Sequence, residues 1–359
     1  MRLASSYEQL AFTSSAVFRR KRRTAFATSS PLLAVPIMLP SEIIRKARKF
    51  TERILDHQDS IREDLTLAFR HAWTLPFLIL PHNSESSTKS ELDWHSYNSL
   101  GDVLNVLIQA IVPANRPSYS TGTIACYPEH YTYKTAKEKW FFINGIATSP
   151  PVAILNCKEL ARIFDRPVHL IHTPTYGAVW DLWDSIIART LRKDGHLSKP
   201  AYDLVKQALA SHDKVVLVGH SQGTIVSSYI ARKLLKDKQF RHLAPKLEIY
   251  CVAGVADSFR LDRQLSEKLG RGVPYVEHFS NGFDFFCRIG VLAYQKDTAG
   301  AIFNIENRKG HLLNDHYLAG IERGDYCGGK SRLSRYINGE SPAPNYYVNP
   351  PRASLEMAS

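Results

Sequence analysis

From about residue 138 onward, short apolar runs alternate with longer amphipathic stretches. The apolar runs predict strands at 140–143, 168–172, 215–218, 247–252, 275–279 and 301–305. Apolar residues at helical spacing predict helices near 152–164, 177–193, 199–211, 223–236 and 258–269. This alternation predicts an α/β fold with a mostly parallel central sheet and helices on both faces. In such sheets, functional groups gather where the strands end.

The chain before residue 122 has a different pattern. After Ser41, a plausible helix N-cap, apolar residues recur at helical spacing through 42–72 and again in 101–112, with a polar, Ser-rich loop at 82–100. We therefore expect 42–121 to be a helical accessory region, which could form a lid over the site. The α/β domain should span 122–330, with one or two early strands within 122–136. Residues 1–41 and 331–359 are expected to be tails.

One turn between a predicted strand and a predicted helix indicates chemistry. Gly219, His220, Ser221, Gln222 and Gly223 follow the strand at 215–218 and precede an apolar helical pattern. G-x-S-x-G in this context is typical of a nucleophile elbow. The turn is so sharp that the residues on either side need to lack side chains, and the two glycines meet this need. The sequence predicts that Ser221 is a nucleophile.

A serine nucleophile needs a base and a carboxylate that orients the base. Asp284 follows the strand at 275–279 and is the preferred carboxylate, while Asp257, after the strand at 247–252, is the alternative. Either could instead be a helix N-cap. After the last strand come His311, in a loop behind Gly310, and His316, within the next predicted helix. We expect His311 to be the base because a loop can reach Ser221, with His316 as the alternative.

An oxyanion formed at Ser221 would need two backbone N–H groups. One should come from Gln222. The other should come from the Asn144-Gly145 turn after the strand at 140–143, through the N–H of Gly145 or Ile146. His220 is not expected to be the base, because its side chain should point away from the direction of the serine.

Together, these residues resemble the α/β-hydrolase superfamily, in its lipase and esterase branch. The resemblance covers about residues 122–325. It implies an acyl-enzyme on the elbow serine, a histidine that shuttles the proton, a carboxylate that holds the histidine, and no metal or organic cofactor. The region 42–121 has no counterpart in the minimal fold of that superfamily.

Composition and charge narrow the functional classes. The chain has 359 residues, 44% of them hydrophobic, and a net charge of +12, of which +5 lies in residues 1–41. The rest is only moderately basic, so nucleic acid is not an expected partner. Five scattered cysteines without a C-x-x-C pair fit a reducing compartment. No apolar run reaches the length of a membrane span. The tail, rich in Ser, Ala and Arg, resembles a transit peptide, which would indicate a mitochondrial location. If it is only a disordered tail, a cytoplasmic location is expected.

The sequence therefore predicts a serine hydrolase acting on a carboxylic ester, with lipid or other hydrophobic acyl substrates favoured. A thioesterase or amidase could use the same residues. A non-catalytic binding module could use the same scaffold. The basic tail could also hold the protein at a membrane surface.

Overall fold

The computed structural model describes most of the α/β part of the chain and short pieces of the region before it. The described residues are 52, 56, 58–81, 88–93, 95, 124–128, 137–146, 148–173, 198–256, 259, 273–326, 330–342 and 356–357. Contacts divide the chain after Phe50, and every described residue belongs to the second unit. The predicted tail 1–41, the predicted helices at 101–112 and 177–193, and nearly all of 258–269 lie outside the described residues.

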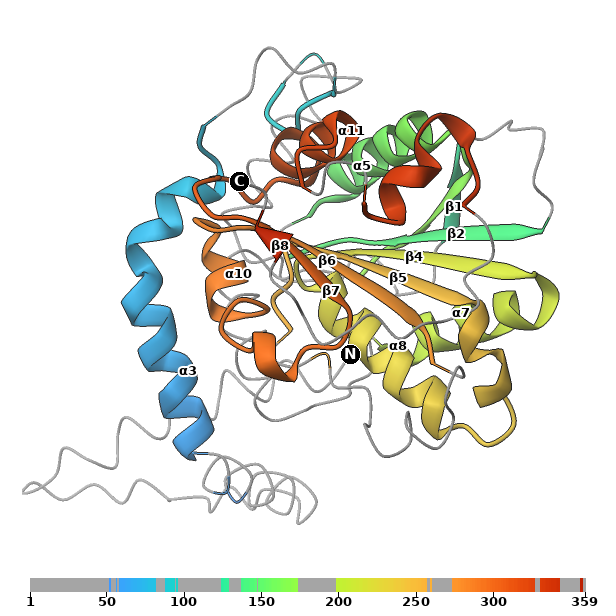
Figure 1. Cartoon of the computed structure of the whole chain (residues 1–359), viewed down its shortest axis with the longest axis horizontal. Coiled ribbons are helices and arrows are strands. Elements are labelled where there is room, and N and C mark those ends of the chain that lie inside the picture. Colours follow the sequence, from blue (N-terminus) through green and yellow to red (C-terminus); the bar gives the residue numbers. More distant parts are fainter. Residues whose placement is uncertain are drawn as a thin grey trace, which may run out of the picture. The chain divides into compact units, whose positions relative to one another are not determined.

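A twisted, mostly parallel sheet forms the centre of the α/β part (Figure 1). Its strand order is β1-β3-β2-β4-β5-β6-β7-β8, and only β1 runs antiparallel to its neighbour. The strands are β1 Ile124–Tyr127, β2 Glu138–Ile143, β3 Val168–Ile171, β4 Lys214–His220, β5 Leu247–Val252, β6 Tyr275–Asn281, β7 Ala301–Ile305 and β8 Glu356–Met357. All six predicted strands are present, and β1 falls where early strands were expected. The prediction of an α/β fold is confirmed.

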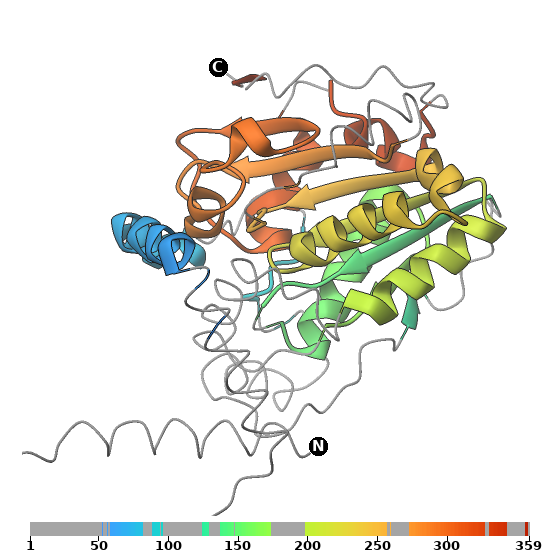
Figure 2. The same cartoon turned by 90° about the horizontal axis from the view of Figure 1, so that it is seen from below.

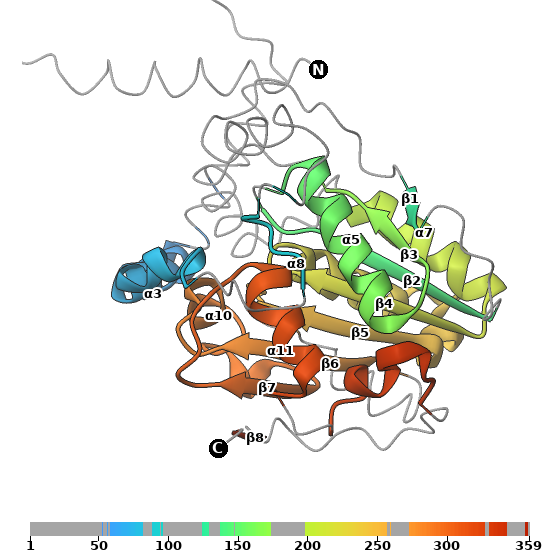
Figure 3. The same ribbon diagram turned by 90° about the horizontal axis from the view of Figure 1, so that it is seen from above.

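Helices cover both faces of the sheet. The longer ones are α5 Pro150–Phe164, α7 Ser198–Ser211 and α8 Gly223–Lys236, close to the predicted limits. Helix α5 lies on one face together with α11 Ala319–Arg323 (Figure 3), and α7 and α8 lie on the other (Figure 2). The remaining helical segments are short: η3 Arg241–Lys246, α10 Phe285–Ile289, η4 Gln295–Asp297, the π-helix η5 Leu313–Leu318 and η6 Leu333–Gly339.

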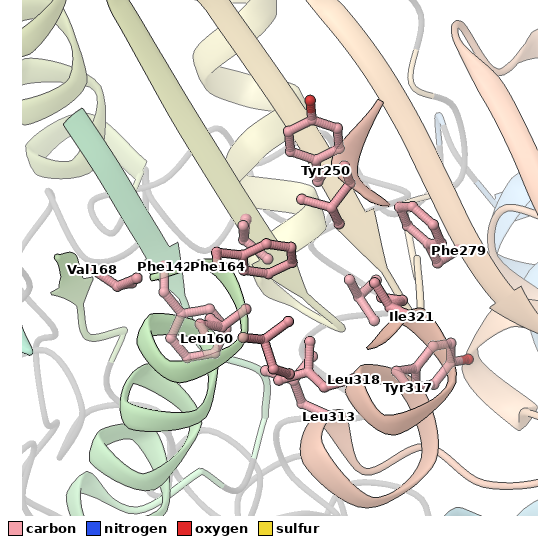
Figure 4. Packing of buried hydrophobic residues seen from close by; sticks show 14 of the residues in the cluster. Phe142, Leu160, Phe164, Val168, Tyr250, Phe279, Leu313, Tyr317, Leu318 and Ile321 are labelled. Carbon is pink, nitrogen blue, oxygen red and sulfur yellow. The ribbon is translucent and has the colours of Figure 1, made fainter. Parts of the chain in front are cut away.

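The core follows from the alternation of side chains along each strand. Phe142 of β2 and Tyr250 of β5 face α5, η5 and α11, where they pack with Leu160, Phe164 and Leu318 (Figure 4). The neighbouring residues of the same strands point the other way and pack under α7 and α8. Because both faces are buried, the strands are apolar almost throughout, as parallel strands require.

Of the accessory region, the structure describes one helix with its extension and the short segment 88–93. Helix α3 Gln58–His71 continues into the 3-10 helix η1 Ala72–Leu78, and both contact α10. Tyr294 donates a hydrogen bond to the buried Asp64 of α3. The predicted helical pattern of 42–72 is thus present over 58–71, and most of 82–121 lies outside the described residues. None of the described helices has the length and apolar character needed to cross a membrane.

The prediction of a C-terminal tail from residue 331 is wrong for 331–342. Leu333 and Tyr336 are fully buried in the core, and Tyr336 packs edge-on against Trp140. Their apolar positions are too few to produce a periodic signal in the sequence. What holds the segment is a set of buried carboxylates on β5 and β6, which accept hydrogen bonds from its backbone and side chains.

Candidate active site

Ser221 lies in the turn between β4 and α8, as the sequence predicts. Its backbone has φ of +51°, a left-handed conformation that costs roughly 1–3 kcal/mol for a residue with a side chain. The flanking glycines make the turn possible. A Cβ at Gly219 would lie 2.6 Å from the Ser227 hydroxyl, and one at Gly223 would collide with the Ile143 carbonyl. The buried Ser221 Oγ has no hydrogen-bond partner among the described residues.

Asp284 and His311 form a hydrogen-bonded pair beyond the ends of β6 and β7. The Nδ1 of His311 lies 2.8 Å from Oδ2 of Asp284, which also accepts a 2.7 Å hydrogen bond from the Tyr317 hydroxyl. Oδ1 of Asp284 accepts from the Phe286 amide and caps α10. Because Nδ1 donates to a carboxylate, the other nitrogen of a neutral His311 is an acceptor. That Nε2 is buried and has no partner among the described residues.

The surroundings of Asp284 keep it ionised. Burial by itself raises the pKa of this carboxyl, but His311 and the hydrogen bonds from Tyr317 and Phe286 outweigh burial and leave the pKa below its ordinary value. An ionised Asp284 fixes the His311 tautomer and can stabilise a positive charge on the ring.

His316, the alternative base, has both ring nitrogens occupied. Its Nδ1 accepts a 2.9 Å hydrogen bond from the Leu312 amide, and its Nε2 lies 2.7 Å from the Pro81 carbonyl. Burial lowers the pKa of His316. With no nitrogen left for Ser221, His316 has a structural role. Asp257, the alternative carboxylate, lies outside the described residues.

His220 contacts the candidate base although it is not the base itself. Its Nε2 donates to the His311 carbonyl at 2.9 Å, and the two ring centroids are 4.9 Å apart. Burial, and then the nearby His311, lowers the pKa of His220 to about 3, so this ring stays neutral at physiological pH. This contact ties the chain beside Ser221 to the loop that holds His311. No sequence pattern predicts it, nor the hydrogen bond from Tyr317 to Asp284.

Of the predicted oxyanion residues, Gly145 is in direct contact with the serine. A Cβ at Gly145 would be 2.9 Å from Ser221 Cβ, so the backbone of this turn packs directly on Ser221. Asn144 holds the turn in place because its side chain bonds both the amide and the carbonyl of Thr173 at the end of β3. Ile146 follows in the same turn, and Gln222 is the N-cap of α8, directly after Ser221 in the chain.

No group of three His, Cys, Asp or Glu side chains in the described ranges is arranged to hold a metal ion.

Comparisons with known proteins give little further information. No protein-family model matches the chain, and no curated protein matches it. Among solved structures, it is similar to a crystal structure described as a "putative thioesterase" from Silicibacter sp. TM1040, with a TM-score of 0.32 and 14% identity. That similarity covers 61% of this chain and 85% of the other. The chemistry of this chain is therefore inferred from its own residues.

Proposed function

We propose that this chain is a serine hydrolase of the α/β-hydrolase type that cleaves carboxylic esters through an acyl-enzyme on Ser221. One observation supports this most strongly. A strained, unpaired serine in a strand–helix turn directly follows His220, whose ring lies 4.9 Å from the ring of His311, and His311 forms with Asp284 a pair whose free nitrogen is an acceptor. Other buried polar atoms of the described residues also lack partners, but Ser221 Oγ and His311 Nε2 are a nucleophile and a base of the kind that acyl transfer needs, which supports groups kept free for a substrate.

The proposed reaction uses each group once in each half. His311 Nε2 takes the Ser221 proton as Oγ bonds to the ester carbonyl carbon, and the carbonyl oxygen becomes an oxyanion. The N–H groups of Gln222 and of Gly145 or Ile146 would stabilise that charge. The bond to the leaving alcohol then breaks, and His311 returns the proton to it. Water repeats the sequence, which releases the acid and restores Ser221.

Apolar residues around the site favour a hydrophobic acyl group. Val255, Phe285, Phe286 and Ile289 form a cluster, which Ile146 joins from the turn after β2 and Ile225 joins from the first turn of α8. The Phe286 ring lies 4.5 Å from the His311 ring, centroid to centroid. Thioesters and amides could be cleaved with the same groups. Peripheral membrane contact stays a prediction from the basic residues 19–23, which lie outside the described part of the chain.

A fluorophosphonate activity probe tests the proposal, because it labels only an activated serine. We expect the wild-type protein to be labelled and Ser221→Ala to be silent. His311→Ala should lose labelling by a factor of about 10³ or more, since it removes the base. His212→Ala, just before the start of β4 and at the other end of that strand from Ser221, serves as the matched histidine control when normalised to folded protein by circular dichroism, and it should keep most of the labelling.

Silence of folded wild-type protein, with and without detergent, would overturn the enzyme proposal and favour a non-catalytic binding module. Labelling that survives in Ser221→Ala would place the reactive group elsewhere.

A further inference from the structure

Two described pieces of the accessory region bind the loop that holds His311. The Leu78 carbonyl accepts from the His311 amide, and the Pro81 carbonyl accepts from the His316 ring. Further along the chain, the Lys89 carbonyl accepts from the Asn314 side chain at 2.9 Å. These contacts link segments more than 220 residues apart, so the accessory region helps to form the site.

Glu91 makes the most concentrated of these contacts. Its Oε1 accepts from the Asn314 amide and from the Asn156 side chain, each at 2.8 Å, and its Oε2 accepts from the Asp315 amide at 3.2 Å. Asn156, on α5, also bonds the Asn314 side chain. Glu91 is only 7% exposed, so it reaches these partners inside the protein.

The position of these amides explains why an acidic residue suits the site. Asn314 and Asp315 are in the first turn of the π-helix η5, which runs directly into α11. Helix N-termini have free N–H groups and a positive dipole end, and a carboxylate satisfies both. Burial raises the pKa of Glu91 above its ordinary value, and the hydrogen bonds from Asn314, Asn156 and Asp315 offset only part of this rise. Burial of a carboxyl group is unfavourable, so we expect Glu91 to be kept for the backbone groups that it binds.

What it holds is the chain just beyond the candidate base. His311 is separated from η5 by Leu312 alone, and Gly310 on its other side has φ of +103°. The loop thus has a conformationally permissive residue before His311 and depends on the start of η5 for its position after it. Displacement of a catalytic group by about 1 Å can lower a rate by about 10²-fold.

We propose that Glu91 is a positioning residue for His311, which it fixes through the backbone of Asn314 and Asp315. This inference rests on the proposed hydrolase function. It assigns to the accessory region a specific part in the reaction: the base is positioned by a residue outside the α/β domain.

Glu277 offers a matched control. It is equally buried, and its two carboxylate oxygens accept from two consecutive amides, Arg332 and Leu333, in front of and within η6. Its partners lie at the other end of the sheet from Ser221. Glu91→Gln, Glu91→Ala and Glu277→Gln should therefore be compared for fluorophosphonate labelling rate, for kcat and KM on a short-chain p-nitrophenyl ester, and for Tm.

We expect Glu91→Ala to be labelled about 10- to 100-fold more slowly than wild type. In ester hydrolysis the loss should appear in kcat, while KM should stay within about twofold of the wild-type value. Glu91→Gln keeps one carbonyl oxygen for Asn314 and Asn156, so it should recover part of the rate. Glu277→Gln should lower Tm and leave the labelling rate per folded molecule unchanged.

The outcomes separate the two proposals. Unlabelled wild type overturns the hydrolase function itself. If wild type is labelled and the folded Glu91 variants, Glu91→Gln and Glu91→Ala, are labelled at the wild-type rate, the positioning role alone is overturned. The positioning role is also overturned if Glu91→Gln and Glu277→Gln lose the same fraction of the labelling rate for each degree by which their Tm falls. If Glu91→Ala does not fold, Glu91→Gln decides, because a purely structural role would leave its kcat unchanged.

Discussion

The two ends of the sheet treat their polar groups in opposite ways. At the amino end, Glu138 pairs with Lys214 and Arg166, and Glu248 pairs with Arg332. At the carboxyl end, Ser221 Oγ and His311 Nε2 are buried without partners among the described residues. Both ends place polar groups inside the protein, but the first pairs its charges and the second leaves its candidate reacting atoms unpaired.

This difference separates stability from function. A buried charge that loses its partner destabilises a fold by several kcal/mol, so the amino end should respond to mutation mainly through the free energy of unfolding. Unpaired groups and a strained serine cost stability and are kept where a substrate will meet them. Mutations at the carboxyl end should therefore change the rate far more than the stability. Three changes test the comparison.

The largest effect should come from Asp284→Asn. The new amide group would donate toward His311, so Nδ1 would become the acceptor and Nε2 would hold the proton. His311 could then no longer take the proton of Ser221, and we expect kcat/KM and labelling rate to fall by about 10³- to 10⁴-fold. Asn can still accept from the Phe286 amide, but its NH2 group cannot accept from the Tyr317 hydroxyl, so Tm should fall by a few degrees while the rate falls far more. Circular dichroism and ester hydrolysis measured on the same preparation check both parts.

A loss of less than about tenfold in a folded Asp284→Asn variant would contradict the assignment and direct attention to Asp257. A large fall in Tm with little change in rate would make Asp284 only the cap of α10.

At the amino end, Arg332→Met should be the strongest destabiliser. It leaves Glu248, which bonds Arg332 at 2.9 Å, as an uncompensated buried charge, and the free energy of unfolding should fall by about 3–5 kcal/mol. Labelling rate per folded molecule should stay at the wild-type value. Urea unfolding and probe labelling measure the two quantities.

The double variant of Arg332→Met with Glu248→Gln is the control for this charge effect. It should regain part of the stability, since the new amide side chain would be neutral and could still accept from the Tyr336 hydroxyl. A lower labelling rate in folded Arg332→Met would contradict the expectation that the amino end of the sheet affects stability and only the carboxyl end affects the rate.

How much of this could be predicted from the sequence depends on the distance over which a contact forms. Strand β5 matches its predicted limits because, apart from Glu248, it is the apolar run that a buried parallel strand requires. The turn around Ser221 could be predicted because its geometry restricts neighbouring residues. The pair Asp284 and His311 was expected because parallel strands bring their ends together.

The contacts that the sequence does not predict join distant segments through single polar residues. Glu91 meets Asn314, and Arg332 meets Glu248, without any periodic pattern near either one. A lone buried acid in a sequence resembles a surface acid until its partner is known. For this reason the segment 331–342 resembles a tail in the sequence, and the contacts of Lys89 and Glu91 with Asn314 leave no sign there.

The smallest effect concerns His220, which belongs to the carboxyl end yet donates through Nε2 to the His311 carbonyl. Its pKa of about 3 lies below the ordinary value of 6.5, mainly because of burial. The unfolded chain therefore binds a proton here between pH 6.5 and 3 that the folded chain does not, and stability is lost as pH falls through this window. His220→Gln keeps an N–H donor for the carbonyl but has no group that titrates here. Between pH 7 and pH 4.5, its free energy of unfolding should fall by about 1–2 kcal/mol less than that of wild type.

Urea unfolding at both pH values measures the effect of His220→Gln, with pH 8, where His220 is neutral in both states, as the reference. Because His220 is already neutral in the assay range, the variant should label within about threefold of wild type. Its rate should also fall over the same acid pH range as that of wild type. An unchanged pH dependence of stability would contradict the buried neutral state of His220. A shifted pH–rate profile would instead show that His220 affects the ionisation of a reacting group, by its own titration or through its contact with His311.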